Sequence, residues 1–166
     1  MICENIKVFS QNVCKNSLII YFILKTHSDS DIIFIQEPFW ICICSILSLL
    51  NCEGEELVGI PNHPNWVMFS RNLTNTRDFP RVLVYINIHI SFLCFSLHND
   101  IFNHRDISCI LFFNWGSIQF LLNIYSNSSQ SALNYLKDIE VDLDNVLLMT
   151  GNFNIRNCLW NTSFSF

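Results

Sequence analysis

The sequence predicts an α/β or α+β fold in which short strands alternate with helices, and three observations support this prediction. Apolar runs rich in β-branched residues, such as residues 31–36 and 82–86, indicate buried strands. Between such runs, residues 128–137 show helical spacing of apolar side chains. Hydrophobic residues make up 51% of the 166 positions and charged residues only 14%, which excludes a disordered chain.

The first half of the chain predicts a strand, a helix and a second strand in succession. The apolar run at residues 39–50 is shorter than the roughly 20 residues that a bilayer span requires, so we interpret it as a buried helix. The expected elements are a strand at 6–11, a helix at 17–26 with Ser17 as a possible cap, a strand at 31–36, a helix at 39–50, a loop with Gly and Pro at 53–64, and a strand at 66–70.

The second half predicts more strands, one hairpin and one helix. No internal repeat or linker divides the sequence, so we expect one domain spanning residues 1–166. The expected elements are a polar turn at 72–80, a strand at 82–86, strands at 106–113 and 118–125 joined by a hairpin turn at 114–117, a helix at 128–137, and a final strand at 146–153.

The eight cysteines lack the paired two-residue spacing of zinc sites, and most of them lie in apolar runs. We therefore expect reduced thiols buried in the core. The N-terminus lacks the basic and apolar regions of a secretory signal. We expect an intracellular protein of the nucleus or cytoplasm that is neither secreted nor bound to a membrane.

The formal net charge of −5 argues against non-specific electrostatic binding of nucleic acid over a broad surface. It does not exclude a nuclease, because enzymes that use a divalent cation at a phosphodiester need carboxylates and only a few local basic residues. Each candidate arginine is more often a solvated surface residue than a phosphate ligand. The arginines that could contact phosphate are Arg71, Arg77, Arg81, Arg105 and Arg156.

Polar residues follow four of the expected strands, at the point where each strand ends. A cleft beyond strand ends is where open α/β folds bind ligands, so we expect these side chains to converge. Each residue alone more often makes a cap or a turn. The four groups are Gln11-Asn12, Gln36-Glu37, Tyr125-Ser126-Asn127 and Gly151-Asn152-Phe153-Asn154.

Side-chain chemistry suggests roles for these residues. Glu37 offers the hard oxygen ligand that Mg²⁺ prefers, to be completed by waters and substrate phosphate. Asn12 and Asn154 could bind phosphate oxygens or hold a neighbouring group, and Tyr125 could donate a hydrogen bond to phosphate. The five histidines have no partner at ligand spacing, and we expect local hydrogen bonds or ion pairs for His63 and His104.

Gln36-Glu37-Pro38 and the 151–154 tetrapeptide, taken together, carry a resemblance to a known family. The sequence resembles the endonuclease/exonuclease/phosphatase superfamily, and specifically the endonuclease domain of non-LTR (LINE-type) retrotransposons. The similarity extends through residues 6–12, 31–40, 59–66, 81–87, 104–107, 122–126 and 150–160.

The resemblance implies a two-sheet sandwich flanked by helices and a Mg²⁺-dependent endonuclease that nicks DNA, with Mn²⁺ as an alternative metal. Glu37 would bind the metal, and Asn12 would orient the site. Tyr125 and Asn127 would contact the phosphate, and Asn154 would contact it or position neighbouring groups. Independently of the resemblance, Arg156 is a candidate phosphate ligand by its residue type.

Two departures from the family pattern bear on activity. Asn152 stands where the family has an Asp that acts on the attacking water, and an amide does not accept a proton at neutral pH. Loss of a general base typically costs about 10²–10⁴-fold in rate. The chain also ends at Phe166, before the later strands and the closing Asp-His pair of the family, so we expect a C-terminally truncated fold with exposed strand edges.

Three hypotheses remain open from the sequence. The first is a nuclease by descent whose activity is impaired by Asn152 and by truncation. The second is a non-catalytic remnant of the same fold that binds nucleic acid or protein. The third is an unrelated metallophosphatase in which Gly151-Asn152 begins a metal motif, although no His or acidic ligands follow it.

Overall fold

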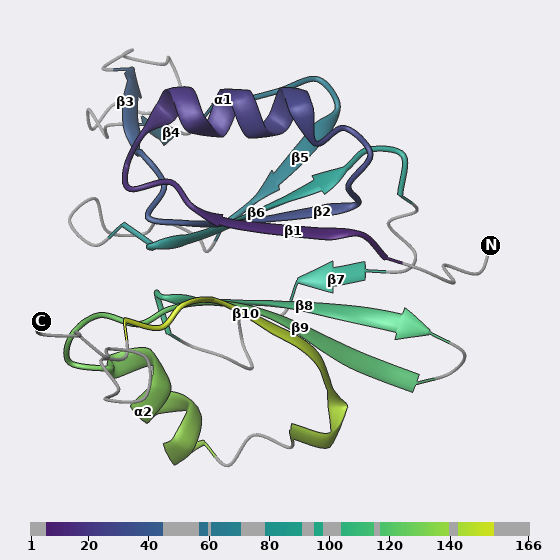
Figure 1. Ribbon diagram of the computed structural model, residues 1–166, viewed down its shortest axis with the longest axis vertical. Helices are drawn as coiled ribbons and strands as arrows, with labels where there is room; N and C mark the ends of the chain where they lie inside the picture. Colours follow the sequence, from purple (N-terminus) through teal and green to yellow (C-terminus); the bar gives the residue numbers. More distant parts are fainter. Residues whose placement is uncertain are drawn as a thin grey trace, which may run out of the picture.

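The protein is built from two stacked β-sheets with a helix on the outer face of each, which gives four layers (Figure 1). The expected two-sheet sandwich flanked by helices is therefore confirmed. The structure is a computed structural model. It describes residues 6–44, 57–59, 61–70, 79–90, 95–97, 104–114, 117–139 and 143–154.

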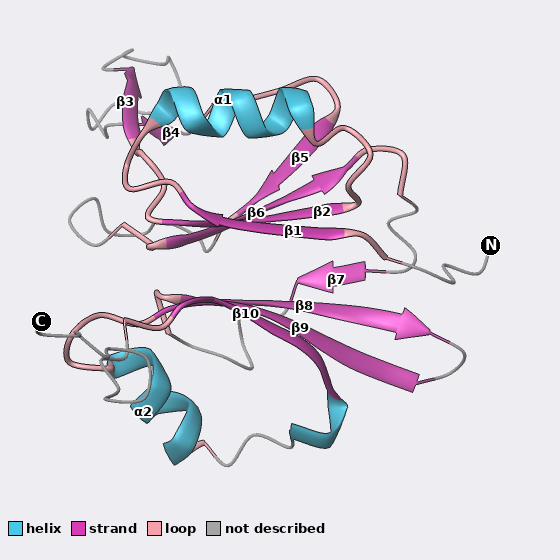
Figure 2. Ribbon diagram, viewed as in Figure 1, coloured by secondary structure: helices cyan, strands magenta, loops and turns pink. Residues whose placement is uncertain are grey.

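The first sheet contains four strands in the order β1-β2-β6-β5, and helix α1 connects β1 to β2 across its outer face (Figure 2). Strands β1 and β2 are parallel, whereas β6 is antiparallel to both β2 and β5. The elements are β1 (Val8–Asn12), α1 (Ser17–Thr26), β2 (Ile32–Gln36), β5 (Trp66–Phe69) and β6 (Val82–Asn87).

The second sheet repeats this plan in the order β10-β9-β8-β7, with α2 between the parallel strands β9 and β10. Both parallel pairs therefore bring the C-terminal ends of their strands together at one edge. The elements are β7 (Phe95–Leu97), β8 (Ile107–Asn114), β9 (Ser117–Tyr125), α2 (Ser131–Asp138), a 3-10 turn (Leu143–Asn145) and β10 (Val146–Asn152).

Helix α1 packs on the first sheet through apolar side chains spaced three and four residues apart. Ile20, Ile23 and Leu24 are buried on its inner face. The cap is Asn16, whose Oδ1 accepts hydrogen bonds from the first helical turn. The expected Ser17 cap is therefore wrong by one residue, because an Asn with extended backbone precedes it.

Three apolar clusters fill the spaces between the four layers. Ile33 and Tyr85 belong to the cluster under α1, Phe34 and Leu121 to the cluster between the sheets, and Ala132 of α2 to the cluster under the second sheet. Strand β2 contributes to two clusters because its side chains alternate between the faces of the sheet. The near-continuous apolar runs in the sequence result from this burial on both faces.

A buried polar network crosses the interface between the sheets. Gln36 Nε2 donates to Asn123 Oδ1 (2.6 Å) and to Ser10 Oγ (3.1 Å), and Thr150 Oγ1 donates to the same serine oxygen (3.0 Å). Gln36 is only 2% exposed. Although it ends a strand as expected, it does not face the ligand edge, because its amide lies between the sheets.

The sequence-based prediction was wrong in the region that follows β2. A buried helix was expected at 39–50, but β3 (Ile41–Cys44) pairs antiparallel with β4 (Leu57–Gly59), which falls inside the expected loop. A short apolar run fits a strand as well as a buried helix, and pairing with a partner strand decides between them. Residues 45–50 of the expected helix and 72–78 of the expected polar turn lie outside the described part of the chain.

The strand β7 was not expected, and α2 begins three residues later than expected. Of the cysteines within the described ranges with placed side chains, Cys109 is buried as expected, whereas Cys14 is exposed in the turn after β1. No helix in the described part of the chain is long and apolar enough to cross a bilayer.

Candidate active site at the strand ends

The candidate site is centred on Glu37, the residue that follows β2. Its backbone is fixed on both sides, because its N–H donates to the Arg81 carbonyl and its carbonyl accepts from Lys15 N–H, both at 2.8 Å. The φ angle of Glu37 is +49°, a left-handed conformation that is unfavourable for a residue with a side chain. Such conformations are typical of functional sites, where the surrounding structure holds them in place.

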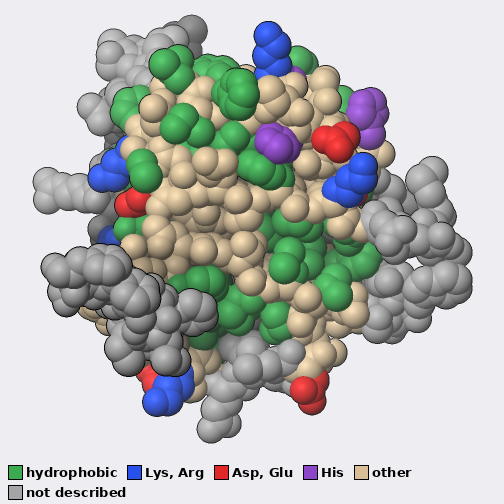
Figure 3. Space-filling view, viewed as in Figure 1, with side chains coloured by type: hydrophobic (Ala, Val, Ile, Leu, Met, Phe, Trp, Pro, Cys, Tyr) green, Lys and Arg blue, Asp and Glu red, His purple; other side chains and the backbone are tan. Residues whose placement is uncertain are grey.

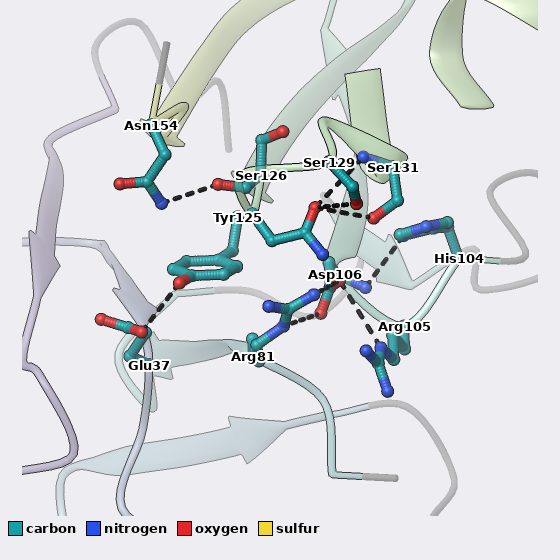
Figure 4. Close-up of polar contacts among 11 residues, drawn as sticks. Glu37, Arg81, His104, Arg105, Asp106, Tyr125, Ser126, Ser129, Ser131 and Asn154 are labelled. Carbon is teal, nitrogen blue, oxygen red and sulfur yellow. Dashed lines mark hydrogen bonds and ion pairs between the residues drawn. The ribbon is translucent and has the colours of Figure 1, made fainter. Parts of the chain in front are cut away.

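The Glu37 carboxylate is oriented by residues from both sheets. Asn12 Nδ2 donates to Oε2 (3.0 Å) from the end of β1. Tyr125 Oη donates to Oε1 (2.8 Å) from the end of β9 (Figure 4). The Asn12 amide is itself held, because its Oδ1 accepts from Cys14 N–H (2.8 Å). Each carboxylate oxygen accepts one of these hydrogen bonds and keeps capacity for another ligand.

An ion pair between the partly buried Arg81 and the buried Asp106 lies against the Tyr125 ring. The Arg81 guanidinium lies over the tyrosine ring, 4.5 Å from its centroid, in a cation–π arrangement. The same guanidinium binds Asp106 through Nε (2.9 Å to Oδ1) and through Nη2 to Oδ2 (Figure 4). Asp106 is fully buried, and Arg105 Nε also lies 3.6 Å from its Oδ2.

These contacts shift the pKa of two groups. Burial, followed by the hydrogen bond and negative charge of Glu37, raises the pKa of the Tyr125 hydroxyl above its usual range, while Arg81 and Asn154 oppose the shift. The hydrogen bonds that Arg81 donates to the Asp106 carboxylate raise the pKa of Arg81. Tyr125 is therefore a neutral donor and Arg81 a permanent cation at physiological pH.

The tetrapeptide at residues 151–154, which contains the last two residues of β10, approaches the same edge. Asn154 Nδ2 donates to the Ser126 carbonyl (2.7 Å), and the backbone of Ser126 donates to the Asn152 carbonyl (2.7 Å). The side-chain oxygen of Asn152 accepts from Asn154 N–H (3.2 Å) and so closes a local turn. Asn154 also has a positive φ of +45°. The turn thus fixes Asn154 near Tyr125.

A cleft of about 390 Å³ opens beside Glu37. Its wall combines the carboxylate with cations and aromatic rings, a mixture that suits an anionic ligand with a flat apolar part. The lining residues are Lys15, Glu37, Pro38, Phe39, Trp40, Phe79, Pro80, Arg81 and Arg105.

The structure brings four of the predicted residues, Asn12, Glu37, Tyr125 and Asn154, into one neighbourhood. Asn127 lies next to this edge, but its side-chain oxygen accepts from Ser129 Oγ and from the first residue of α2. Its predicted contact with phosphate stays a prediction. Arg156 lies outside the described residues, so its role also stays a prediction.

Sequence reasoning missed two features of the site. Arg81 was considered only as a possible phosphate ligand, and its buried partner Asp106 was not connected with the site. The position of Trp40 and Phe79 in one wall was not anticipated either. The only available signal was that a charged residue, Asp106, stands at the start of an apolar strand. This signal does not indicate which residue pairs with Asp106.

The expected local bonding of His63 and His104 is confirmed, since both Nδ1 atoms accept from backbone N–H groups.

The residues present are compatible with a magnesium ion at Glu37. Among the described residues, no group of three or more His, Cys, Asp and Glu side chains could hold a metal. Mg²⁺, however, commonly binds through one or two carboxylates and takes its other ligands from water and substrate phosphate. Glu37 meets this requirement because it is only partly buried, borders the cleft and keeps free acceptor capacity.

No family model matches the sequence, and the search of curated proteins also finds no match. Among the solved structures that are similar, one matches over 94% of this chain: "Endonuclease domain of TRAS1, a telomere-specific non-LTR retrotransposon". The chain has the fold of that endonuclease domain. The TM-score is 0.57 at 12% sequence identity, and the chain spans 62% of the length of the TRAS1 structure. The resemblance noted in the sequence is therefore confirmed at the level of the fold.

Proposed function

We propose that the protein is a Mg²⁺-dependent phosphodiester hydrolase that nicks DNA, with a rate lowered by the amide at position 152. The observation that carries this proposal is the convergence on Glu37 of side chains from two different sheets. A carboxylate held by Asn12 and Tyr125 beside a cleft with basic residues suits a metal and a phosphate. The endonuclease fold of the TRAS1 domain adds support for this reaction class.

Each residue has a role that follows from its contacts. Glu37 would hold the metal, which when bound supplies positive charge to the phosphate oxygens in the cleft. Asn12 and Tyr125 hold the carboxylate in one orientation through their hydrogen bonds. Arg81 stays protonated and keeps Tyr125 in place through its ring contact. Asn154 is close enough to Tyr125 to affect its pKa and would contact the phosphate.

Asn152 limits the rate in this proposal. Hydrolysis requires a group that takes a proton from the attacking water, and an amide oxygen is a poor proton acceptor. Its Oδ1 is also engaged with the backbone of Asn154. An Asp at the same position could form the same local turn and additionally accept a proton.

The competing proposal is a non-catalytic protein that uses the same cleft to bind nucleic acid. The amide at position 152 favours it, because binding through cations and rings needs no proton acceptor. Both proposals share the fold and the cleft, and they differ in whether phosphodiester bonds are cut. The metallophosphatase hypothesis has weaker support. Gly151-Asn152 ends β10, the edge strand of the second sheet, in a fold that is similar to an endonuclease domain.

Nicking of supercoiled plasmid with Mg²⁺ tests the proposal, because a single cut changes the topology. We expect activity near background for the wild type and a gain of about 10²–10⁴-fold for Asn152→Asp. The gain should disappear in the Asn152→Asp/Glu37→Gln double variant and in EDTA. Asn134→Asp is the matched control, since it makes the same amide-to-carboxylate change on the exposed surface of α2, outside the lining of the cleft.

Circular dichroism establishes that each variant is folded. If folded Asn152→Asp nicks no faster than the wild type and the control, the hydrolase proposal fails and the binding proposal is favoured. If the Asn152→Asp/Glu37→Gln double variant nicks as fast as Asn152→Asp, the metal does not act through Glu37.

A further inference from the structure

We infer that the cleft beside Glu37 binds an unstacked nucleobase of a single-stranded DNA segment against Trp40 and Phe79, with the adjoining phosphates on Lys15 and Arg105. The inference rests on the proposed function for its substrate class and adds the part of the substrate that the cleft recognises. It assigns a role to aromatic residues that the proposed chemistry does not use.

The aromatic wall of the cleft is already ordered. The rings of Trp40 and Phe79 are stacked, with centroids 5.7 Å apart and an interplanar angle of 19°. Trp40 Nε1 donates to the Pro80 carbonyl (2.8 Å), which fixes the plane of the indole. Phe39, 40% exposed, lines the same cleft. A nucleobase stacks on such rings through its π-face whatever its sequence identity.

The charge of the cleft is opposite to that of the whole chain. Among the described residues, three cations line it, Lys15, Arg81 and Arg105, together with one carboxylate, Glu37. Even with the buried Asp106 that pairs with both arginines, positive charge predominates here, whereas the chain as a whole carries −5. Arg81 is held by Asp106, while the Lys15 side chain lies in an exposed turn. Anionic phosphates are therefore attracted to this part of the surface although the overall charge repels them.

The dimensions of the cleft also suit this ligand. About 390 Å³ lies within the range of small-molecule sites and accommodates one base with its sugar rather than a duplex. Because Glu37 borders the same space, a base held on the rings places its own backbone next to the proposed metal ligand. The cleft would thus select strands with an unpaired or easily unstacked base.

Fluorescence anisotropy of a labelled ten-nucleotide single strand, measured in EDTA, tests this inference without catalysis. We expect Trp40→Ala to weaken binding by about tenfold or more, as is typical of one lost stacking contact. Trp40→Phe should retain most of the affinity. Phe22→Ala is the control, because Phe22 is 65% exposed on α1, away from the cleft, and its loss should leave binding unchanged.

Two further measurements separate stacking from loss of structure. Phe79→Leu removes the ring but keeps an apolar side chain, and it should also weaken binding. It therefore tests stacking even if Trp40→Ala is poorly folded. The same strand with abasic sugars should bind the wild type as weakly as the intact strand binds Trp40→Ala. Arg105→Gln should reduce the slope of the logarithm of the binding constant against the logarithm of the salt concentration by the amount of about one phosphate contact.

Equal affinity of the folded wild type and both ring variants for the intact strand would overturn the inference, as would equal affinity for intact and abasic strands. The outcome is independent of the nicking experiment. Ring-dependent binding with an inactive Asn152→Asp chain rejects the hydrolase proposal and keeps the base site, whereas nicking without ring-dependent binding rejects the base site alone.

Discussion

Tyr125 donates a hydrogen bond to Glu37 over 2.8 Å, and this contact joins the end of β9 in one sheet to the end of β2 in the other. The two residues are 88 positions apart in the sequence. The orientation of the proposed metal ligand therefore depends on how the two sheets stack. A change at the sheet interface should affect the site even when no site residue is altered.

Substitution of Tyr125 by Phe removes this hydrogen bond and keeps the ring that lies against Arg81. We expect a loss of about 1 kcal/mol in the free energy of unfolding, the usual net value of one hydrogen bond. In the Asn152→Asp background, half-maximal nicking should require more Mg²⁺, because Glu37 is less firmly oriented. Urea unfolding and a Mg²⁺ titration measure the two effects. Tyr21→Phe, on the exposed face of α1, should change neither.

The raised pKa of Tyr125 predicts a pH dependence of stability. The neutral hydroxyl is favoured in the folded state, so its contribution is fully present below the unfolded pKa of about 10. It is lost as the pH rises through the higher folded pKa. Between pH 8 and pH 11, urea unfolding should show a larger loss of stability for the wild type than for Tyr125→Phe. Parallel pH profiles would contradict the assignment.

Replacement of Asp106 by Asn should destabilise the protein strongly. The carboxylate is 0% exposed and the Arg81 side chain 23% exposed, so the substitution leaves a largely buried cation without its partner. We expect a loss of about 2–3 kcal/mol, below the full range for buried pairs because Arg81 reaches solvent. Asp29→Asn, in an exposed pair with Lys7, should cost less than about 1 kcal/mol. Thermal unfolding at pH 7 compares the two.

Substitution of Gly151 by Ala should disrupt the pairing of β10 with β9. Gly151 has a φ of +148°, and an added Cβ would lie 1.8 Å from the Ile124 carbonyl oxygen, which is backbone and has little room to move. We expect a loss of about 3 kcal/mol and faster amide exchange at Ser126, which donates to Asn152. Met149→Ala, two residues earlier and 37% exposed, serves as the control. Equal stability of the two variants would show that the strand end can shift.

The two cysteines whose side chains the structure describes, Cys14 and Cys109, should differ in reactivity. Burial raises the pKa of the Cys109 thiol to about 12, so almost no thiolate forms at pH 8. Cys14 is exposed in the turn after β1. Peptide mapping after brief treatment with iodoacetamide at pH 8 should find Cys14 alkylated, and Cys109 alkylated only after unfolding in urea. Rapid labelling of Cys109 in the native protein would mean that the second sheet opens readily.

The sequence alone determined most of the strands and the edge at which the site lies. β-Branched apolar runs predicted β2 and β6 because such residues are buried in sheets wherever they occur. Polar residues at strand ends predicted that Glu37 and Tyr125 lie near one ligand site, because open α/β folds bind ligands beyond their strand ends. These inferences needed only local pattern and a general rule about sheets.

Only the tertiary structure decided which polar residues face the cleft and which hold the sheets together. Gln36 and Glu37 are neighbours in the sequence, yet Gln36 is buried against Asn123 and Glu37 borders the cleft. The Arg81 pair with Asp106 and the choice of a strand for Ile41–Cys44 also depend on partners distant in the sequence. The physical reason is that a polar side chain or a strand pairs with the groups that the folded chain brings next to it. The local periodicity of the sequence carries no information about which distant segment supplies those groups.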